Sequence, residues 1–412
     1  MVPVSGKAVI VKDGKIDAIV PENEIPAGIS TEDLGGAYLL PGLINLHLHI
    51  PAGGKPPKKP VDYAKLSKLL KIGLCRAVYR KVCEANVRTD MLSGCTTIRA
   101  VGGLPGFDIA IRDKINAGKA AGPRILAADY AISVPGGHMT GSVALPAESA
   151  EEAVAMVEDI AKGNPDLIKL IITGGVLDAE VPGEPGILKM PPEYVSAACA
   201  KAHELGLKVA AHVESTEGMK VALEGGVDTV EHGGKPTDEI ISLFKKTGSV
   251  LIATLSPALP FVDDSGLFKG VSELGHINGV ALLDHMLECV AECRKNGITV
   301  GLGADTGCPY TTHYGFWREL WIYNRLCGVS PAEVLHTATE LNASIAGIGD
   351  ITGSIDEGKA ADFVVTGSNP LSDLSVLREP DMVICGGKIY RKPRVKKIAE
   401  VEEALDKYMA TL

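Results

Sequence analysis

The sequence predicts an α/β fold, namely a (β/α)8 TIM barrel with a small β-sandwich domain formed from both chain ends. Three observations support this prediction. The chain has 412 residues, which is too long for a simple two-layer domain. Its middle alternates eight short β-rich segments with helix-like stretches, which indicates a parallel sheet, and eight such strands close a barrel. Its two ends are rich in β-forming residues but lack this alternation.

The small domain is predicted from segments at opposite ends of the sequence. Residues 7–20 have β-rich arms around Asp13-Gly14, which is the signature of a type I′ hairpin. Strand-like segments occur again at residues 353–367 and at residues 381–393, and the second of these is expected to turn at Gly386-Gly387. We therefore expect residues 1–40 and 352–395 to form one composite sheet domain. Residues 396–412 have helical composition and are expected to form a C-terminal helix.

The barrel is expected to occupy residues 41–351. Its predicted strands lie at residues 42–50, 94–103, 123–133, 166–175, 207–215, 228–234, 249–257 and 298–307. Helical stretches separate most of them, and one ends at Gly206, a typical helix stop. A doubly wound open sheet is the alternative, but no GxGxxG follows the first strand to favour it.

Composition narrows the class of protein. A net charge of −10 and the lack of a basic stripe argue against nucleic acid or an anionic membrane as partner. No apolar run approaches the roughly 20 residues that cross a bilayer, and the first residues lack the regions of a signal peptide. Nine cysteines without CxxC spacing favour free thiols in a reducing compartment. We therefore expect a cytoplasmic globular protein.

Six side chains fall where a barrel places its chemistry, at the C-terminal ends of the strands. Two of them, in "NLHLH", are separated by one residue, so they share a strand face about 6.6 Å apart. The six, drawn from five strands, are His47, His49, Lys169, His212, His232 and Asp305. Their convergence predicts a metal site with two ions.

Each of these residues also has a purely structural explanation. A single histidine on an apolar strand is most often a satisfied core or surface residue, and Asp305 could cap the helix that follows it. Two imidazoles buried side by side without a cation, however, would be poorly satisfied. Lys169 could form a salt bridge or extend outward, but "DLIKLIITGG" is very apolar on both sides. We therefore expect a neutral or modified amine inside the barrel.

The sequence resembles the amidohydrolase superfamily of metal-dependent hydrolases along nearly its whole length. The segments that carry the resemblance are "PGLINLHLH", "GCTTIRAVGG", "IKLIITGGV", "AAHVES", "VEHGG", "GLGADTG" and "ATELNASIAGIGDITGSIDEGKAADFVV". With the loop "SVPGGHMTG", they are most similar to the branch of Xaa-Pro dipeptidase-like, arginine carboxypeptidase-like and ochratoxinase-like enzymes. Imidazolonepropionases are neighbours that generally use one metal and no lysine ligand on the fourth strand.

The resemblance implies a ligand set. Lys169 would carry a carbamate that bridges two divalent ions, while His47, His49 and Asp305 would hold the first ion. His212 and His232 would hold the second. Zinc fits such N/O ligands with open positions, and manganese, iron or cobalt remain compatible.

Two positions depart from the family pattern. Asn45 and Ala100 stand where the family usually has aspartate. Asn45 lies two residues before His47 on the same strand face, so it is expected to support the ligands and not to bind metal. The departures bear on substrate placement more than on metal binding.

The implied activity is cleavage of an amide bond by water that the metals activate, with a dipeptide or N-acyl amino acid as a small-molecule substrate. Asp305 would act as general base and then as general acid. Hydrolysis of a cyclic amide or deamination of a heterocycle would use the same ligands. A non-catalytic barrel is a third hypothesis, which the presence of all six ligands disfavours. Barrels of this kind commonly form homo-oligomers.

Several residues are candidates for contact with substrate. His138, in "PGGHMTG", would reach the substrate carbonyl or carboxylate, or else bond to backbone. Arg99, within the second strand, would pair with an internal carboxylate or hold a substrate carboxylate. Tyr63, Tyr310 and His313 would line the pocket, or else pack in their loops. Residues 51–66, with "GGKPPKKP", would cover the mouth.

Overall fold

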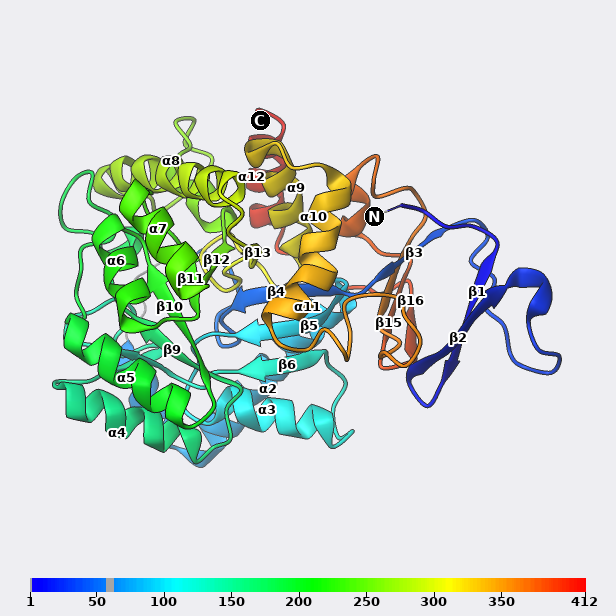
Figure 1. Ribbon diagram of the computed structural model, residues 1–412, viewed down its shortest axis with the longest axis horizontal. Helices are drawn as coiled ribbons and strands as arrows, with labels where there is room; N and C mark the ends of the chain where they lie inside the picture. Colours follow the sequence, from blue (N-terminus) through cyan, green and yellow to red (C-terminus); the bar gives the residue numbers. More distant parts are fainter. Residues whose placement is uncertain (1, 57–62) are drawn as a thin grey trace.

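The structure is a computed structural model that describes residues 2–56 and 63–412, and the side chains of residues 63–65 and 67 also lie outside the description. Figure 1 shows a barrel surrounded by helices, with a smaller β-sheet region beside it that contains the first strands and the last ones. In the described part of the chain, no helix is both long enough and apolar enough to span a bilayer.

The barrel wall is a ring of parallel strands. Its strands in the described chain are β4 (Leu43–Leu48), β5 (Cys95–Ala100), β6 (Arg124–Ala127), β9 (Leu167–Ile171), β10 (Lys208–Val213), β11 (Thr229–His232), β12 (Val250–Ala253) and β13 (Val300–Leu302). Neighbours pair in the order β4-β5-β6 and β9-β10-β11-β12-β13. Each strand falls within one of the eight predicted segments, which confirms the predicted fold class.

Two junctions close the ring. The N–H of His49 donates to the carbonyl of Thr306 at 2.7 Å, and Leu48 pairs with Thr306, so the ends of β4 and β13 meet. At the other junction, the Asp166 N–H donates to the Ala127 carbonyl at 2.9 Å. Strand β7 (Ala131–Ser133) follows β6 in the chain and pairs in parallel with β9. Strand β8 (Ala144–Pro146) pairs in parallel with β7.

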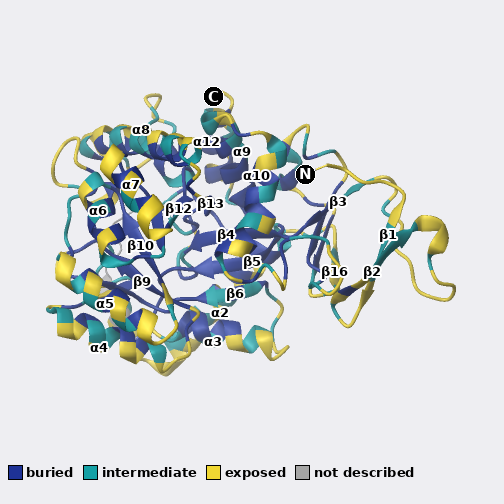
Figure 2. Cartoon of the chain, in the orientation of Figure 1, coloured by how far each residue is buried: buried dark blue, intermediate teal, exposed yellow. Residues whose placement is uncertain are grey.

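Helices surround the wall. They are α1 (Tyr63–Leu70), α2 (Gly73–Leu92), α3 (Phe107–Asn116), α4 (Ala150–Ala161), α5 (Pro192–Glu204), α6 (Thr216–Gly225), α7 (Asp238–Thr247), α8 (Glu273–Lys295), α9 (Phe316–Cys327), α10 (Pro331–His336) and α11 (Asn342–Ile345). Serine or threonine hydroxyls cap several of them, as Ser149 does for α4 and Thr237 for α7. The predicted stop at Gly206 has φ +74° and follows α5 closely. Figure 2 shows the strands buried and the outer helix faces exposed.

The smaller sheets join both ends of the chain. Strands β1 (Lys7–Lys12) and β2 (Lys15–Pro21) form the predicted hairpin, and Asp13 and Gly14 have the positive φ values that a type I′ turn requires. Strand β3 (Tyr38–Pro41) pairs antiparallel with β14 (Phe363–Thr366), which pairs with β15 (Met382–Cys385) and then β16 (Lys388–Arg391). Ile16, Phe363 and Ile384 belong to one apolar cluster of these sheets. The residue bounds given above for the domains remain a prediction.

The last helix, α12 (Ala399–Met409), packs against the barrel. Its Glu402 accepts a hydrogen bond from Arg318 of α9 at 2.9 Å. Its Val401 and Leu405 share an apolar cluster with Phe268 and with Tyr310 from the loop after β13. The C-terminal helix therefore packs against the loop after β13, which lies at the carboxyl end of the strands.

Candidate metal centre

Three of the predicted ligands meet around one carboxylate oxygen. The Nε2 atoms of His47 and His49 lie 3.4 and 3.3 Å from Oδ1 of Asp305. Two ligand atoms that are each about 2.1 Å from a tetrahedral ion lie roughly 3.4 Å apart. Each of the two histidine nitrogens therefore lies from Asp305 at the distance expected for two ligands of one small divalent ion.

The other two histidines continue the cluster. The ring centroid of His232 lies 4.7 Å from that of His47 and 4.7 Å from that of His212. The donor atoms of His47, His232 and Asp305 all lie within 4.8 Å of one another, as do those of His212, His232 and Glu214. Two adjacent groups that could each hold an ion thus share His232.

The second nitrogen of each histidine is already bonded to the protein. The bonds join Nδ1 of His47 to Glu231 at 2.7 Å, Nδ1 of His49 to the Gly102 carbonyl at 2.8 Å, Nδ1 of His232 to Thr254 at 2.6 Å, and Nε2 of His212 to the Gly174 carbonyl at 3.1 Å. Such bonds fix the orientation and tautomer of a metal-binding imidazole. They leave Nε2 of His47, His49 and His232, and Nδ1 of His212, available to a metal.

Burial keeps these imidazoles in the form that binds metal. Burial and, to a smaller extent, the charge of Lys169 lower the pKa of His47 to about 4. Burial likewise lowers the pKa of His212 and His232 well below the usual histidine value. The rings of His47, His212 and His232 are therefore neutral at pH 7, as a metal ligand must be.

Lys169 lies inside the barrel, as predicted from its apolar neighbours. Its side chain is 1% exposed, and its Nζ has no hydrogen-bond partner among the residues that the structure describes. Burial lowers its pKa to about 8, although the carboxylates of Glu231 and Asp305 oppose this shift. A buried amine beside a histidine cluster fits the ligand set, because it needs a partner that the described residues do not supply.

The backbone at the site is held in unusual conformations. His232 has φ +71° and Asp305 has φ +50°, a left-handed region that costs free energy for residues other than glycine. Gly303 permits the close approach of β13 to β4, because a Cβ there would lie 2.4 Å from that of His47. Asn45 stabilises the same junction, since its Oδ1 accepts the N–H groups of His47 and Ala304 at 3.2 and 3.0 Å.

Glu231 is a site residue that the sequence analysis missed. It is fully buried, and its carboxylate accepts hydrogen bonds from His47 at 2.7 Å, from Arg99 at 2.8 and 2.9 Å, and from Thr229. Burial tends to raise the pKa of Glu231, but Arg99 and His47 outweigh this effect and hold the pKa below its usual range. One signal was present, since Thr229 and Glu231 are polar residues at spacing two in a predicted barrel strand.

Arg99 therefore pairs with an internal carboxylate, which was one of the two roles considered for it from the sequence. Besides its two bonds to Glu231, its Nε donates to the Leu46 carbonyl at 2.6 Å and its Nη1 donates to Thr229 at 3.2 Å. The guanidinium is 5% exposed. A substrate-binding role for Arg99 does not fit this geometry, because its donors are committed to the barrel interior.

His138 stands at the mouth beside the second group of ligands. Its ring stacks on that of His212 at 4.6 Å with an interplanar angle of 15°. Its Nδ1 bonds to Asp178 at 3.0 Å, a residue that the sequence analysis did not single out. Gly175 allows this arrangement, because a Cβ there would lie 2.9 Å from the His138 ring.

The other predicted pocket residues have structural partners. His313 bonds through Nδ1 to Asp90 at 2.7 Å and through Nε2 to the Ala52 carbonyl at 2.8 Å, so both ring nitrogens are occupied. Tyr310 packs on Phe268 at 4.8 Å, and its hydroxyl accepts the Lys269 N–H at 2.8 Å. His313 and Tyr310 therefore fit a role in packing their loop better than a role in direct contact with substrate. Tyr63 begins α1, but its side chain and much of the 51–66 loop lie outside the described residues.

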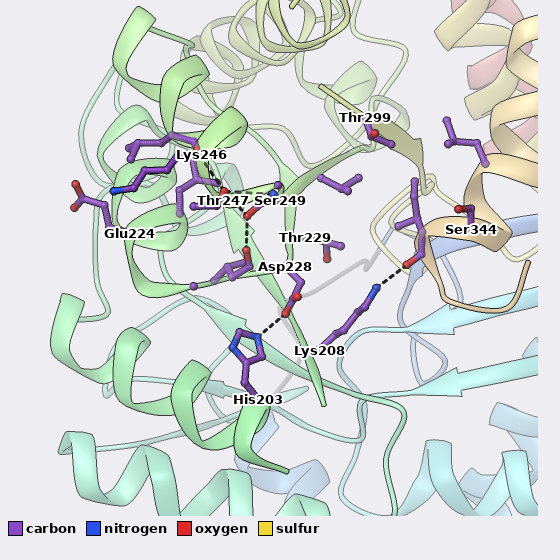
Figure 3. Close-up of a pocket in the computed structure, with 18 residues that line it drawn as sticks. His203, Lys208, Glu224, Asp228, Thr229, Lys246, Thr247, Ser249, Thr299 and Ser344 are labelled. Atoms are coloured by element: carbon purple, nitrogen blue, oxygen red, sulfur yellow. Dashed lines mark hydrogen bonds and ion pairs between the residues drawn. The ribbon is translucent and has the colours of Figure 1, made fainter. Parts of the chain in front are cut away.

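A separate hollow lies at the opposite end of the barrel. Its volume is about 800 Å³, and Figure 3 shows Lys208, Thr229, Ser249 and Thr299 among the side chains that line it. These residues lie at or just before the amino ends of strands β10 to β13. Barrel enzymes perform their chemistry at the other end, so the histidine cluster is the candidate active site.

Known proteins resemble this chain along nearly its full length. The sequence pattern of the amidohydrolase family matches residues 38–390, and that of the NagA composite domain matches residues 4–39. The crystal structure of a candidate prolidase from Bifidobacterium longum superimposes with a TM-score of 0.85 and 34% identity, covering 98% of this chain and 94% of that one.

Two further relatives lie in the predicted branch. The structure of a Xaa-Pro dipeptidase with bound methionine in its active site has a TM-score of 0.78 and 27% identity, covering 93% of this chain and 94% of that one. Ochratoxinase of Aspergillus niger is 26% identical over 427 residues, covering 95% of this chain and 84% of that protein. These similarities confirm the resemblance inferred from the sequence, and with the family pattern over residues 38–390 they show that the chain belongs to the amidohydrolase family.

Proposed function

We propose that the protein is a binuclear metal-dependent hydrolase that cleaves the amide bond of a dipeptide or an N-acyl amino acid. As a member of this family it is a hydrolase that acts on carbon–nitrogen bonds. The observation that carries the finer proposal is the cluster itself. His47 and His49 each lie at ligand spacing from Asp305, and two groups of donor atoms that share His232, namely His47, His232, Asp305 and His212, Glu214, His232, could each hold an ion.

The proposed ligand set consists of the six residues singled out in the sequence. His47, His49 and Asp305 would hold one ion, and His212 and His232 the other. Lys169, whose buried amine lacks a partner in the described chain, would carry a carbamate and serve both ions. Zinc suits these ligands. A pair of divalent ions supplies two effects, namely a lower pKa of water and polarisation of the scissile carbonyl.

The remaining chemistry belongs to side chains of this protein. Asp305 would take the proton of the attacking water and deliver it to the leaving nitrogen. The thiol of Cys308 donates to Asp305 Oδ2 at 3.2 Å and so leaves Oδ1 facing the histidines. Asp178 accepts a hydrogen bond from Nδ1 of His138, so only the doubly protonated ring would donate from Nε2 to the substrate carbonyl oxygen as negative charge develops there.

The substrate class rests on the relatives. They include a candidate prolidase, a Xaa-Pro dipeptidase and an ochratoxinase, over nearly the full length of this chain. The proposed substrates share an amide bond next to an amino acid with a free carboxylate. A cyclic amide or an aminated heterocycle is the alternative class, and the ligand set is equally compatible with it.

The test combines metal analysis with a substrate panel. Purified protein should contain up to two equivalents of a transition metal, lose activity on chelation and regain it when metal is restored. The panel should contain dipeptides, N-acyl amino acids, lactams and aminated heterocycles, with release of amino acid and of ammonia both measured.

A matched pair of variants assigns the site. His47→Gln should lose metal and activity, whereas His203→Gln should retain both, because His203 lies on α5 and bonds to Asp228 at 2.9 Å. Full activity without metal would refute the mechanism. Ammonia released from a heterocycle, without cleavage of any dipeptide or N-acyl amino acid, would replace the proposed substrate class.

A further inference from the structure

Glu214 is a buried carboxyl group at the mouth that the proposed mechanism leaves without a task. It follows His212 by two residues at the carboxyl end of β10 and is 8% exposed. Its Oε2 accepts the Val176 N–H at 3.1 Å. Its Oε1 lies 3.9 Å from Nε2 of His212 and accepts no hydrogen bond from any residue described in the structure. One oxygen is therefore anchored, and the other is available to a ligand.

Glu214 has no cationic side chain as a partner among the described residues. No lysine or arginine of that part of the chain forms an ion pair with it. A buried carboxyl group with one unpaired oxygen is poorly satisfied unless a hydrogen-bond donor reaches it.

A role as a further metal ligand is the competing explanation. The donor atoms of His212, Glu214 and His232 lie within 4.8 Å of one another. However, His212 uses Nε2 to bond the Gly174 carbonyl, which leaves Nδ1 for metal, and Glu214 lies against the Nε2 side. The bond from Val176 also holds one carboxyl oxygen away from coordination.

We infer that Glu214 receives the free amine of the acyl half of the substrate and thereby makes the enzyme select dipeptides over N-acyl amino acids that lack this amine. The inference rests on the proposed function and sharpens its substrate class. An α-amine lies two bonds from the scissile carbonyl carbon, so a group beside His212 and near Asp305 is within its reach once the carbonyl is bound. The ammonium would donate to Oε1, the carboxyl oxygen that has no donor among the described residues.

The test compares two substrates that differ only at this amine. A glycyl dipeptide and its glycolyl analogue, in which a hydroxyl replaces the ammonium group, carry the same C-terminal amino acid. Wild-type enzyme should show a kcat/KM for the glycyl substrate about tenfold to hundredfold higher, the range expected for a hydrogen bond to a charged group. Glu214→Gln should reduce this ratio to about 1, and Glu214→Asp, which shortens the reach of the charge, should give an intermediate ratio.

Metal content and a surface control separate the explanations. Both Glu214 variants should keep the metal content of the wild type. Glu217→Gln, at an exposed glutamate in the first turn of α6, should keep the wild-type ratio. Loss of one metal equivalent in Glu214→Gln would make Glu214 a ligand and overturn the inference. An unchanged ratio in that variant would also overturn it.

The wild-type enzyme alone provides a decisive result if the variants do not fold. Equal kcat/KM for the glycyl and glycolyl substrates would overturn the inference while leaving amide hydrolysis intact. Failure of the metal-loaded enzyme to cleave any member of the wider amide panel would overturn the proposed function itself. The two failures are therefore distinguishable.

Discussion

Replacing Glu231 by glutamine should have two effects that can be measured independently. It should lower the free energy of unfolding, and it should lower the affinity for metal. The carboxylate is fully buried and accepts bonds from Arg99 at 2.8 and 2.9 Å and from His47 at 2.7 Å. Removing one partner of a buried ion pair costs about 3–5 kcal/mol, because the other charge remains buried without compensation. Loosening a residue that orients a metal ligand lowers metal affinity about 10- to 100-fold, or roughly 1.4–2.7 kcal/mol.

The matched control is Asp362→Asn. Asp362 is also a buried carboxylate, 3% exposed, and it accepts bonds from Arg124 at 3.0 Å and from Thr352 at 3.0 Å. Arg124 begins β6, at the end of the barrel remote from the ligands. The control should therefore lose stability but bind metal as the wild type does.

Two measurements distinguish these effects. Urea unfolding of the metal-free proteins gives the loss of stability, and titration against a chromophoric chelator gives the metal dissociation constant. If Glu231→Gln lost stability but bound metal as tightly as Asp362→Asn, the bond from Glu231 to His47 would not orient the ligand. The reasoning from that bond would then be refuted.

Three further predictions concern other parts of the site. Lys169→Ala should lower the metal content, measured by elemental analysis, because it removes a proposed ligand. It should also reduce kcat/KM by about 10²- to 10³-fold in steady-state kinetics, since it removes one group that stabilises charge at the site. Unchanged metal content and turnover would contradict the ligand role. His138→Ala should reduce kcat by about 10²-fold with little change in metal content. Asp178→Asn should reduce kcat less, because this substitution only frees the His138 ring to reorient. A loss of metal in His138→Ala would instead make His138 a ligand. The charge of Asp90 raises the pKa of His313 against the opposing effect of burial, so the stability from that protonated ring is fully present below the unfolded pKa of about 6.5 and is lost as pH rises through the folded value. The stability difference between wild type and His313→Gln should therefore be larger at pH 6 than at pH 9 in urea unfolding, and an equal difference would contradict this assignment.

The clustering of the candidate ligands could be predicted because their positions depend on local patterns. His47 and His49 alternate with leucines at the end of an apolar strand, so any half-buried strand places both rings on one face. Asp305 and His232 follow other apolar runs at the same end, where parallel strands of a barrel converge. The hairpin at Asp13-Gly14 was also predictable, because that dipeptide tolerates two positive φ values.

The partners of these ligands could not be predicted in the same way. Arg99 needed some carboxylate, but nothing in its neighbourhood selected Glu231, which lies four strands further around the barrel in space and far along the chain. His313 and Tyr310 follow Asp305 closely and were expected at the pocket. Asp90 of α2 and Phe268 engage them instead, and both belong to distant segments.

The sequence alone therefore determined which segments become strands, which residue types stand at their carboxyl ends, and hence the kind of metal chemistry. Strand periodicity and turn chemistry are local properties, so they can be recognised without the fold. The tertiary structure decided which buried charges neutralise one another and which carboxyl group, Glu214, keeps an unpaired oxygen at the mouth. Those pairings arise only when barrel closure brings remote strands within hydrogen-bond distance.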